Sequence, residues 1–483
     1  SSGSSGVYTY AQRSANHDTN NYNTGTYYNS DYLGTPTNVA SNNPTNFETT
    51  EAENGAVLVT YANHAYARGW TGKGSTALIM DTGIDQDHPE FTGKVKYLWD
   101  AGYTTPYEDE NGHGSHVAGI VSANKDGTGI HGIAYDANLA IAKIGEANGI
   151  SLSGAKQALN WAKQYDDIVV ANLSANTNYS SAYKSSMTDQ GSGIFTNEHV
   201  VYGGSNYYNL EDPTTWKEVI PDELVLVVSA GNTDLGYVQN PATFASAVDS
   251  NNNLELDGRM LIAGNWNTST QTIDGAKSGH VCKDYTTQCN DTYKTSDFYI
   301  LAPGTNINSV KNGGGYARMS GTSQAAPVIT GGVAIVHQLW PYMKGKNIAQ
   351  LLLQTANKDL SNYSITTHGQ GLLDLDKATQ PVGGLGISLT GRTGATTSIS
   401  GGLSINGVDD SVISSLSSIS AIDDFDRDFK VDLTSMIKQN DNLMPLQSDY
   451  KKGDSWGTML SNLDVKSLDG FIIGLENKEH FLI

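Results

Sequence analysis

The sequence is poor in cysteine, in proline and in basic residues. It has 2 cysteines and 12 prolines in 483 residues, and 29 lysines and arginines stand against 50 aspartates and glutamates, a formal net charge of −21. Nucleic-acid binding requires a basic footprint, so we exclude a general nucleic-acid partner. Such an acidic surface favours a soluble monomer. An extracellular or saline setting and plain solubility explain it equally well.

Long hydrophobic runs are also missing. No stretch approaches the roughly 18 apolar residues of a membrane-spanning helix. We therefore expect membrane attachment only through segments that this chain does not contain. The first six residues, SSGSSG, resemble a tag remnant or flexible linker, and we do not expect them to form part of the fold.

The two cysteines, Cys282 and Cys289, are separated by six residues. This spacing matches no usual zinc-binding pair. It favours a small loop closed by a disulfide, which would imply an oxidising compartment. Two unpaired thiols remain the alternative.

Composition divides the chain into three regions. Residues 1–52 are polar, and we expect a tag remnant followed by an extended arm. Residues 53–380 alternate apolar runs with helical stretches and predict the main domain, which the long polar excursions 175–222 and 251–297 interrupt. From residue 381 onward, alternating apolar and small polar residues with frequent glycine predict a β-rich C-terminal extension, 381–483.

The main domain reads as an α/β fold. Apolar runs predict strands, and small-residue stretches predict helices between them. The strands are expected at 76–80, 139–144, 168–174 and 224–232, and the helices at 116–123, 153–165 and the second half of 56–70. Continuous apolar strands that alternate with helices are typical of a parallel sheet covered on both faces. Right-handed crossovers then give a doubly wound, mostly parallel sheet.

Four short motifs each present one chemically useful side chain. In ALIMDTGID a buried strand ends at Asp81, where open α/β sheets place their sites. In NGHGSHVAG glycines on both sides of His113 let its imidazole face a cleft. In SGTSQAAP Ser323 stands at the start of a helix, where free N–H groups favour an anion. In VVSAGN Asn232 follows a strand and can donate a side-chain N–H.

Each motif also has an ordinary structural explanation. A strand-end aspartate often caps a turn, and an isolated Gly-Thr-Ser is by default a serine N-cap. A strand-end asparagine is usually a turn residue, and a lone histidine is more often structural, as we expect of His116. A metal site at His113 and His116 is disfavoured because the acidic partner of a His-Glu-x-x-His helix is missing.

Together, in the order Asp, His, Asn, Ser, the motifs DTGID, HGSHVAG, SAGN and SGTSQAAP resemble the four signatures of the subtilisin-like serine peptidases. The resemblance covers about residues 55–380. It implies a secreted or cell-surface endopeptidase that acts on protein or peptide substrates without an organic cofactor. Ser323 would be the nucleophile, His113 the general base and Asp81 the residue that orients His113. Asn232 and the Ser323 backbone N–H would form the oxyanion hole.

The resemblance also implies a substrate-binding set, with one departure. The family usually has Ser-Leu-Gly after its fourth core strand, and here the residues are Ser174, Ala175 and Asn176. The wall of the main specificity pocket therefore cannot be read from the family pattern. Ala230 and Gly231 complete the expected substrate-binding residues.

A calcium site is one of two open explanations for the loop ANKDGTGI (123–130). The loop resembles one in calcium-binding subtilisins, and Glu90 and Asp126 match positions that supply oxygen ligands there. An Asp-Gly pair in a loop is equally an ordinary turn.

Finer features resemble one branch of the family. SGTSQAAPVITGG, DDFDRDFKVDLTSMI (423–437) and the cysteine pair before LAPG resemble the peptidase passengers of Gram-negative subtilase autotransporters. Only about 100 residues follow the peptidase region, without the strands of a membrane barrel. Two rival functions are a surface adhesin on a dead peptidase scaffold and an esterase or lipase. The intact Asp, His, Asn and Ser disfavour the first, and the absence of Gly-x-Ser-x-Gly disfavours the second.

Overall fold

The structure is a computed structural model that describes most of the main domain and short parts of the rest. The described ranges are 56–67, 69–146, 149–176, 213–232, 238–239, 241–275, 294–383 and 419–431, with short strands elsewhere within 200–207 and 386–482. The predicted arm, both cysteines and most of the 175–222 excursion lie outside the described residues. The chain divides into two compact units between Thr379 and Gln380, and each is described by itself.

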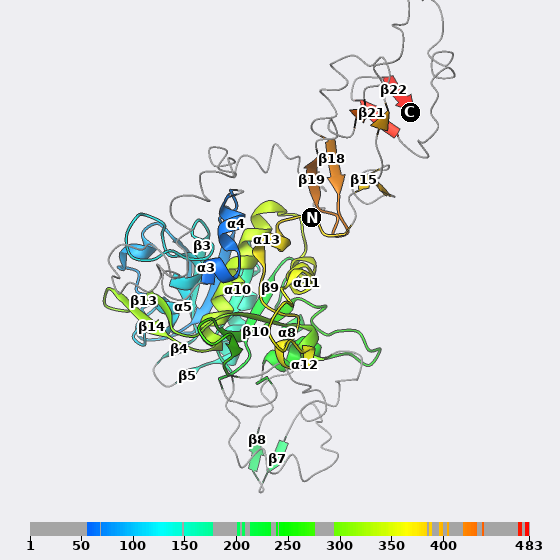
Figure 1. The fold of residues 1–483 in the computed structure, drawn as a ribbon. Coiled ribbons are helices and arrows are strands. Elements are labelled where there is room, and N and C mark those ends of the chain that lie inside the picture. The colour runs from blue at the N-terminus through cyan, green and yellow to red at the C-terminus, as the bar shows by residue number, and fades with distance from the viewer. Residues whose placement is uncertain are drawn as a thin grey trace, which may run out of the picture. The chain divides into compact units, whose positions relative to one another are not determined.

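A mostly parallel sheet forms the centre of the larger unit (Figure 1). Its strands are β1 (Thr76–Asp81), β2 (Val95–Asp100), β3 (Asn138–Lys143), β6 (Ile168–Leu173), β9 (Val225–Ser229), β10 (Met260–Asn267), β11 (Thr272–Ile273) and β12 (Tyr299–Pro303). Their order is β11-β10-β9-β6-β1-β3-β2, with β12 also beside β10. Each pair is parallel except β10 with β11. The predicted mostly parallel α/β architecture is confirmed.

The interior strands follow from continuous apolar sequence. β1, β6 and β9 are buried along their whole length, as strands covered on both faces must be. The excursion predicted at 251–297 is wrong in part, because β10 lies inside it. Gly264 and Asn265 interrupt the apolar run of β10. Gly264 is needed there because a side chain would collide with the ring of Tyr299 from β12.

Helices cover both faces of this sheet. They are α3 (Ala56–Val59), α4 (Ala62–Ala67), α5 (His113–Ser122), α6 (Leu152–Ala162), α8 (Pro213–Lys217), α10 (Thr322–Leu339), α11 (Gly345–Thr355), α12 (Ile365–His368) and α13 (Leu375–Ala378), with 3-10 turns η2 (Pro89–Phe91), η3 (Ala242–Ser246) and η4 (Thr295–Asp297). Leu78 and Met80 of β1 share a core cluster with Leu159 of α6. Successive strand residues point to opposite faces, and α5 and α10 pack on β1 and on each other.

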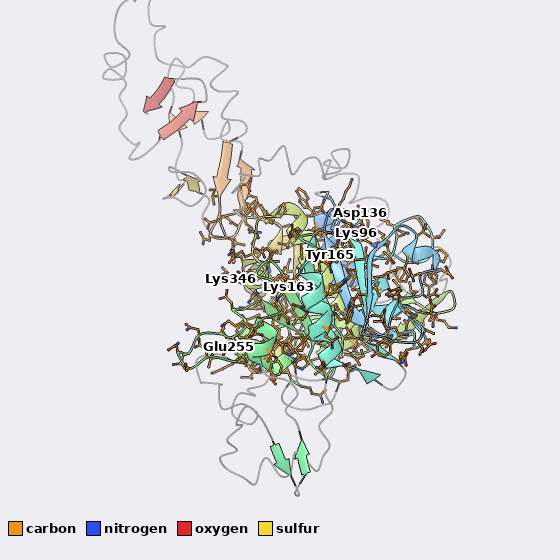
Figure 2. All side chains as sticks on the ribbon, turned by 180° about the vertical axis from the view of Figure 1, so that it is seen from behind. Lys96, Asp136, Lys163, Tyr165, Glu255 and Lys346 are labelled. Atoms are coloured by element: carbon orange, nitrogen blue, oxygen red, sulfur yellow. The ribbon has the colours of Figure 1, made fainter. Side chains whose placement is uncertain are left out.

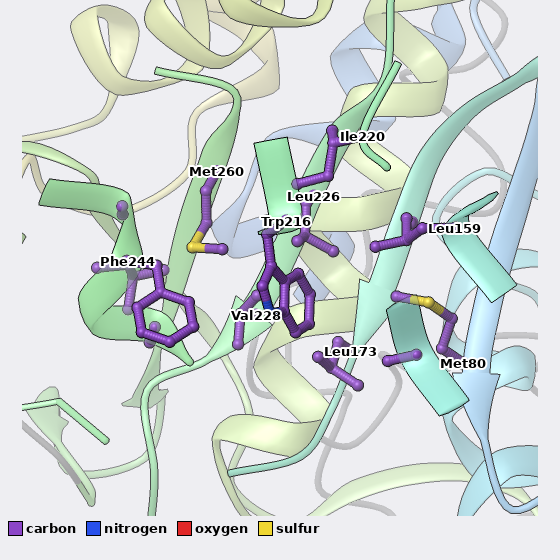
Figure 3. Packing of buried hydrophobic residues seen from close by; sticks show 14 of the residues in the cluster. Met80, Leu159, Leu173, Trp216, Ile220, Leu226, Val228, Phe244 and Met260 are labelled. Atoms are coloured by element: carbon purple, nitrogen blue, oxygen red, sulfur yellow. The ribbon is translucent and has the colours of Figure 1, made fainter. Parts of the chain in front are cut away.

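The core is mainly apolar, and most of the charged side chains lie on the exterior. Figure 3 shows the fully buried Trp216 of α8 among aliphatic residues, with the ring of Phe244 at 6.3 Å in an edge-to-face arrangement. Charged side chains such as Lys96, Lys163 and Lys346 lie on the exterior (Figure 2). None of the described helices is long and apolar enough to span a membrane.

The described part of the larger unit also has three hairpins that do not belong to this sheet. β4 (Gly145–Glu146) pairs with β5 (Gly149–Ile150) just after β3. β7 (Val200–Tyr202) pairs with β8 (Ser205–Tyr207) inside the predicted excursion. β13 (Ile307–Val310) pairs with β14 (Tyr316–Met319). β14 ends three residues before α10 begins at Thr322.

The described parts of the smaller unit are short strands, as its alternating sequence predicts. β15 (Gly386–Ser388), β16 (Thr396–Ser398), β18 (Ile419–Ile422) and β19 (Asp428–Val431) form one antiparallel sheet, and the pairs β17 (Leu403–Ser404) with β20 (Ile437–Lys438) and β21 (Ile472–Leu475) with β22 (Glu479–Leu482) stand apart. In the β18–β19 turn, the buried Arg427 donates from Nη2 and Nε to the buried Asp423 carboxylate, at 2.6 and 2.9 Å. This ion pair joins the two strands.

Three core histidines should make the fold sensitive to mild acid. Burial lowers the pKa of His116, His131 and His337 to about 4 each. In the unfolded chain their pKa is about 6.5. The contribution of these three neutral histidines to the free energy of unfolding is therefore fully present above pH 6.5. As the pH falls towards 4, only the unfolded chain takes up these protons, so the free energy of unfolding drops by up to about 3 kcal/mol per histidine.

The thermal midpoint of the Ser323→Ala variant, followed by circular dichroism, should therefore fall between pH 7 and pH 4.5. Adding His337→Gln should make this fall shallower, because one of the three groups is removed. A pH dependence unchanged by His337→Gln would contradict the assignment for that residue.

Candidate active site

The four motif residues lie at helix starts and strand ends of the sheet. Asp81 is the last residue of β1, and His113 is the first residue of α5. The preceding Gly112 has φ +90°, a backbone conformation that favours glycine. Ser323 is the second residue of α10, and Asn232 follows β9. In open α/β sheets the carboxyl ends of the strands are where ligand sites form.

Asp81 orients the imidazole of His113. The Asp81 carboxylate is 1% exposed, and its Oδ1 accepts hydrogen bonds from His113 Nδ1 and from the Thr82 backbone N–H, both at 2.8 Å. A carboxylate can only accept, so this hydrogen bond places the proton on Nδ1. His113 Nε2 then has a free lone pair with which it can accept a proton.

The charges around His113 raise its pKa. Burial alone would lower the pKa of this histidine. The charge of Asp81, the hydrogen bond from His113 to Asp81, and the charge of Asp109 together outweigh burial, so the pKa is raised from its ordinary value. The side chain stays 24% exposed, which leaves it accessible from the cleft.

Ser323 is held through Ser174. The Ser323 hydroxyl donates to the Ser174 carbonyl oxygen at 3.2 Å, and the Ser174 hydroxyl donates to the Ser323 carbonyl oxygen at 2.8 Å. Among the described residues the Ser323 hydroxyl makes no hydrogen bond to His113. Catalytic hydrogen bonds are often long in a free enzyme and tighten when substrate binds.

Asn172 supports Ser174 and was not identified from the sequence. Its Nδ2 donates to Ser174 Oγ at 2.9 Å, and its Oδ1 accepts from Thr330 of α10 at 3.1 Å. The asparagine is fully buried in β6. The available signal was one amide inside the apolar run IVVANLS, since a buried polar group needs partners.

The Asn232 amide is oriented by Thr322. Its Oδ1 accepts from the Thr322 backbone N–H at 2.8 Å and from Thr322 Oγ1 at 3.0 Å. The Nδ2 group therefore keeps its protons for another acceptor. Gly321 permits this approach, since a Cβ there would lie 3.0 Å from Asn232 Oδ1 and 3.1 Å from Nδ2.

A cavity of about 310 Å³ lies beside His113. Its lining residues are Thr82, Asn111, His113, Glu146, Gly149, Ile150, Leu152, Ser174, Ala175 and Asn176. The predicted segment Ser174–Asn176 thus faces this cavity, whereas Ala230 and Gly231 do not line it. The Asn176 amide donates to Ser229 O at 2.5 Å and accepts from Ser229 Oγ at 2.7 Å, so this departure from the family pattern ties the segment to β9.

Asp109 organises the loop before His113, and the sequence reasoning missed it. The carboxylate is fully buried and accepts five hydrogen bonds of 2.7 to 3.1 Å. The donors are Thr82 Oγ1, the backbone N–H groups of Asn111, Gly112 and Ser115, and Ser115 Oγ. Thr82 Oγ1 also accepts from the Gly114 backbone N–H at 2.9 Å. The only sequence signal was an aspartate ahead of an Asn-Gly turn.

The two candidate calcium ligands each accept hydrogen bonds from neighbouring residues. Glu90 Oε1 accepts from Tyr316 Oη at 2.6 Å and from the Ile130 backbone N–H at 3.2 Å. Asp126 Oδ1 accepts from the backbone and hydroxyl of Thr128, which is an ordinary turn. No group of three or more acidic, histidine or cysteine side chains suited to a metal occurs in the part of the chain that the structure describes. Calcium binding at Glu90 and Asp126 stays a prediction. The expected disulfide of Cys282 and Cys289 lies outside the described residues.

Comparisons with known proteins agree on one family. The model of the subtilase family, Peptidase_S8, matches residues 72–372. "Subtilisin Savinase" of Lederbergia lenta is 28% identical over 322 residues, which cover 65% of this chain and 94% of that protein. "Thermostable alkaline protease" of Halalkalibacterium halodurans is 28% identical over 319 residues, 65% of this chain and 70% of that protein.

Two further similarities are more limited. "Extracellular serine protease" of Serratia marcescens is 28% identical over 355 residues, but the match covers 63% of this chain and only 31% of that protein. The solved structure "S41 Psychrophilic Protease" gives a TM-score of 0.44 at 22% identity, and covers 63% of this chain and 92% of that one. The family match extends over more than half of the chain. The chain belongs to the subtilase family and is a serine endopeptidase.

Proposed function

We propose that this endopeptidase hydrolyses peptide bonds through an acyl-enzyme on Ser323, with His113 as general base and Asp81 as its orienting partner. The observation that carries the proposal is the 2.8 Å hydrogen bond from His113 Nδ1 to Asp81 Oδ1. It leaves Nε2 free to accept a proton. Ser323 stands at the amino terminus of α10, where a nucleophile and N–H donors occur together.

The proposed chemistry has two halves. His113 Nε2 accepts the Ser323 proton while Oγ attacks the carbonyl carbon, and the same proton passes to the leaving amine as the C–N bond breaks. Water, deprotonated by His113, then hydrolyses the ester and restores Ser323. Asn232 Nδ2 and the Ser323 backbone N–H donate to the oxyanion of each tetrahedral intermediate. No organic cofactor takes part.

The setting of the reaction is also a proposal. We propose a secreted or cell-surface monomer that acts on proteins or peptides. The similarity to the extracellular serine protease of Serratia marcescens supports secretion. The 423–437 motif supports a passenger-type protein of the autotransporter branch. Surface exposure is tested by protease shaving of intact cells that express the natural full-length protein.

Burst kinetics test the acyl-enzyme. With a peptide p-nitrophenyl ester, the first turnover should release about one product per active site before the slower steady state. A peptide p-nitroanilide with the same sequence should also be hydrolysed. Hydrolysis of the ester but not of the amide would favour the esterase, and hydrolysis of neither would favour the adhesin.

Asp109→Asn is expected to reduce kcat by up to about 100-fold with little change in KM, because the loop that positions His113 loses acceptors. It should also move the acid limb of the kcat–pH profile to lower pH. The Asp109 charge contributes to the raised pKa of His113, so its removal lowers that pKa.

Glu110→Gln is the matched control, because it removes the charge of an exposed neighbour outside this hydrogen-bond network. Circular dichroism verifies folding of both variants. A reduced kcat with an unmoved acid limb would make Asp109 purely structural.

A further inference from the structure

The cavity beside His113 contains one acidic side chain, Glu146. It belongs to the β4–β5 hairpin, which leaves β3 close to Asp81, since the Ile144 backbone N–H donates to the Asp81 carbonyl oxygen at 2.8 Å. The Glu146 side chain is 36% exposed. Apart from His113, the other lining residues are neutral. An acidic group thus faces the space next to the general base.

The buried Lys143 does not satisfy the hydrogen-bonding capacity of the Glu146 carboxylate. Its ammonium lies 3.8 Å from Glu146 Oε1, and its side chain is fully buried. Its three protons are already used in hydrogen bonds to Thr105 O, Thr105 Oγ1 and Glu108 O, at 3.1, 3.1 and 2.7 Å. The charge of Lys143 therefore partly offsets the charge of Glu146, but Lys143 donates no hydrogen bond to it. Among the described residues no other group donates to this carboxylate either.

The rest of the cavity wall suits a long side chain with an apolar stem. Ile150 and Leu152 are partly buried and pack against the core, so each has exposed surface left for the cavity. Arginine and lysine lay their methylenes on apolar surface and keep the charged end near polar groups. The planar guanidinium also matches a carboxylate with two parallel hydrogen bonds.

We propose that this cavity is a specificity subsite for an arginine or lysine side chain of the substrate, with Glu146 as the residue that selects the positive charge. The inference rests on the proposed endopeptidase function of the same site. It gives the substrate class as peptides that carry a basic residue close to the scissile bond. The overall charge of −21 acts in the same direction, because it attracts basic peptides.

Arginine and citrulline have the same shape and differ in charge, so they separate charge selection from fit. A neutral internally quenched peptide is prepared as two series, in which arginine or citrulline is moved through each position on both sides of the cleaved bond. Mass spectrometry identifies the bond cut in every peptide. At one position the wild-type enzyme should prefer arginine by about tenfold in kcat/KM. The preference should shrink as salt is raised, because the subsite is open to solvent.

Glu146→Gln should abolish the preference, so that the arginine and citrulline peptides are cleaved with similar kcat/KM. Glu110→Gln, the same exchange outside the cavity lining, should retain it. Equal cleavage of both series by the wild type, or an arginine preference that survives Glu146→Gln, would overturn the subsite while peptide cleavage itself upholds the enzyme. If no peptide of either series is cut, the proposed function fails and the subsite fails with it.

Discussion

Ser323→Ala is expected to lower kcat for peptide hydrolysis by about 10⁶-fold, the size of the loss when subtilisin loses its nucleophile. Alanine has no oxygen with which to form the acyl-enzyme, so only binding and oxyanion stabilisation remain. The change removes one hydroxyl, which among the described residues donates one hydrogen bond, to the Ser174 carbonyl oxygen. The fold should therefore survive, with a near-native circular dichroism spectrum.

The matched control is Ser153→Ala, the same exchange at an exposed position of α6. Initial rates on one quenched peptide compare the three proteins. The control should keep its rate. A Ser323→Ala enzyme that works at near wild-type rate would show that another residue is the nucleophile.

Asp81→Asn is expected to lower kcat by about 10⁴-fold, as measured for the same change in a Ser-His-Asp triad. The Asp81 Oδ1 atom accepts from both Thr82 and His113. An amide has one acceptor oxygen and carries no charge. The imidazolium that forms in the transition state therefore loses its counter-charge, and an amide rotated by 180° would favour the wrong tautomer of His113.

The kcat–pH profile gives this prediction a second measurement. The charge of Asp81 is one cause of the raised pKa of His113, so the acid limb of Asp81→Asn should lie at lower pH than that of the wild type. Asp87→Asn, at an exposed position in the same loop, should leave both the limb and kcat unchanged. An Asp81→Asn enzyme with wild-type kcat would remove Asp81 from the mechanism.

Local sequence patterns sufficed for the interior strands β1, β3, β6 and β9, but not for β10. Runs such as TALIM and IVVANLS are apolar throughout because the strands they form are covered on both faces. β2, at the edge of the sheet, is only half buried, and its mixed sequence VKYLWD gave no such signal. β10 was not predicted because Gly264 and Asn265 interrupt its apolar run. Gly264 is required by the ring of Tyr299 in the neighbouring β12, which the local sequence does not show.

The site residues were predictable where the local sequence of one motif determines the backbone conformation. The glycines on both sides of His113 predicted an unusual backbone conformation there, and the structure has Gly112 at φ +90°. Asp109 and Asn172 were missed because their importance depends on partners brought together by the fold. The roles of Asp81, His113, Asn232 and Ser323 stay predictions.

The residues that line the cavity were likewise predictable only in part. Ser174–Asn176 was expected to face substrate from the family pattern, and it lines the cavity. The part of the lining with Glu146, Ile150 and Leu152 was not expected, because only the tertiary structure places the β4–β5 hairpin beside His113. The calcium expectation rested on two matching positions, and the hydrogen bond from Tyr316 to Glu90 could not be read from them, because Tyr316 lies far along the chain.

Covalent labelling with a fluorophosphonate tests the central claim most directly. Such a probe phosphonylates a serine only where a base activates its hydroxyl. The folded wild-type enzyme should incorporate about one probe per chain. Peptide mass mapping should place it on Ser323, and His113→Ala should slow labelling severely. Labelling at another serine, or none in folded protein, would contradict the account.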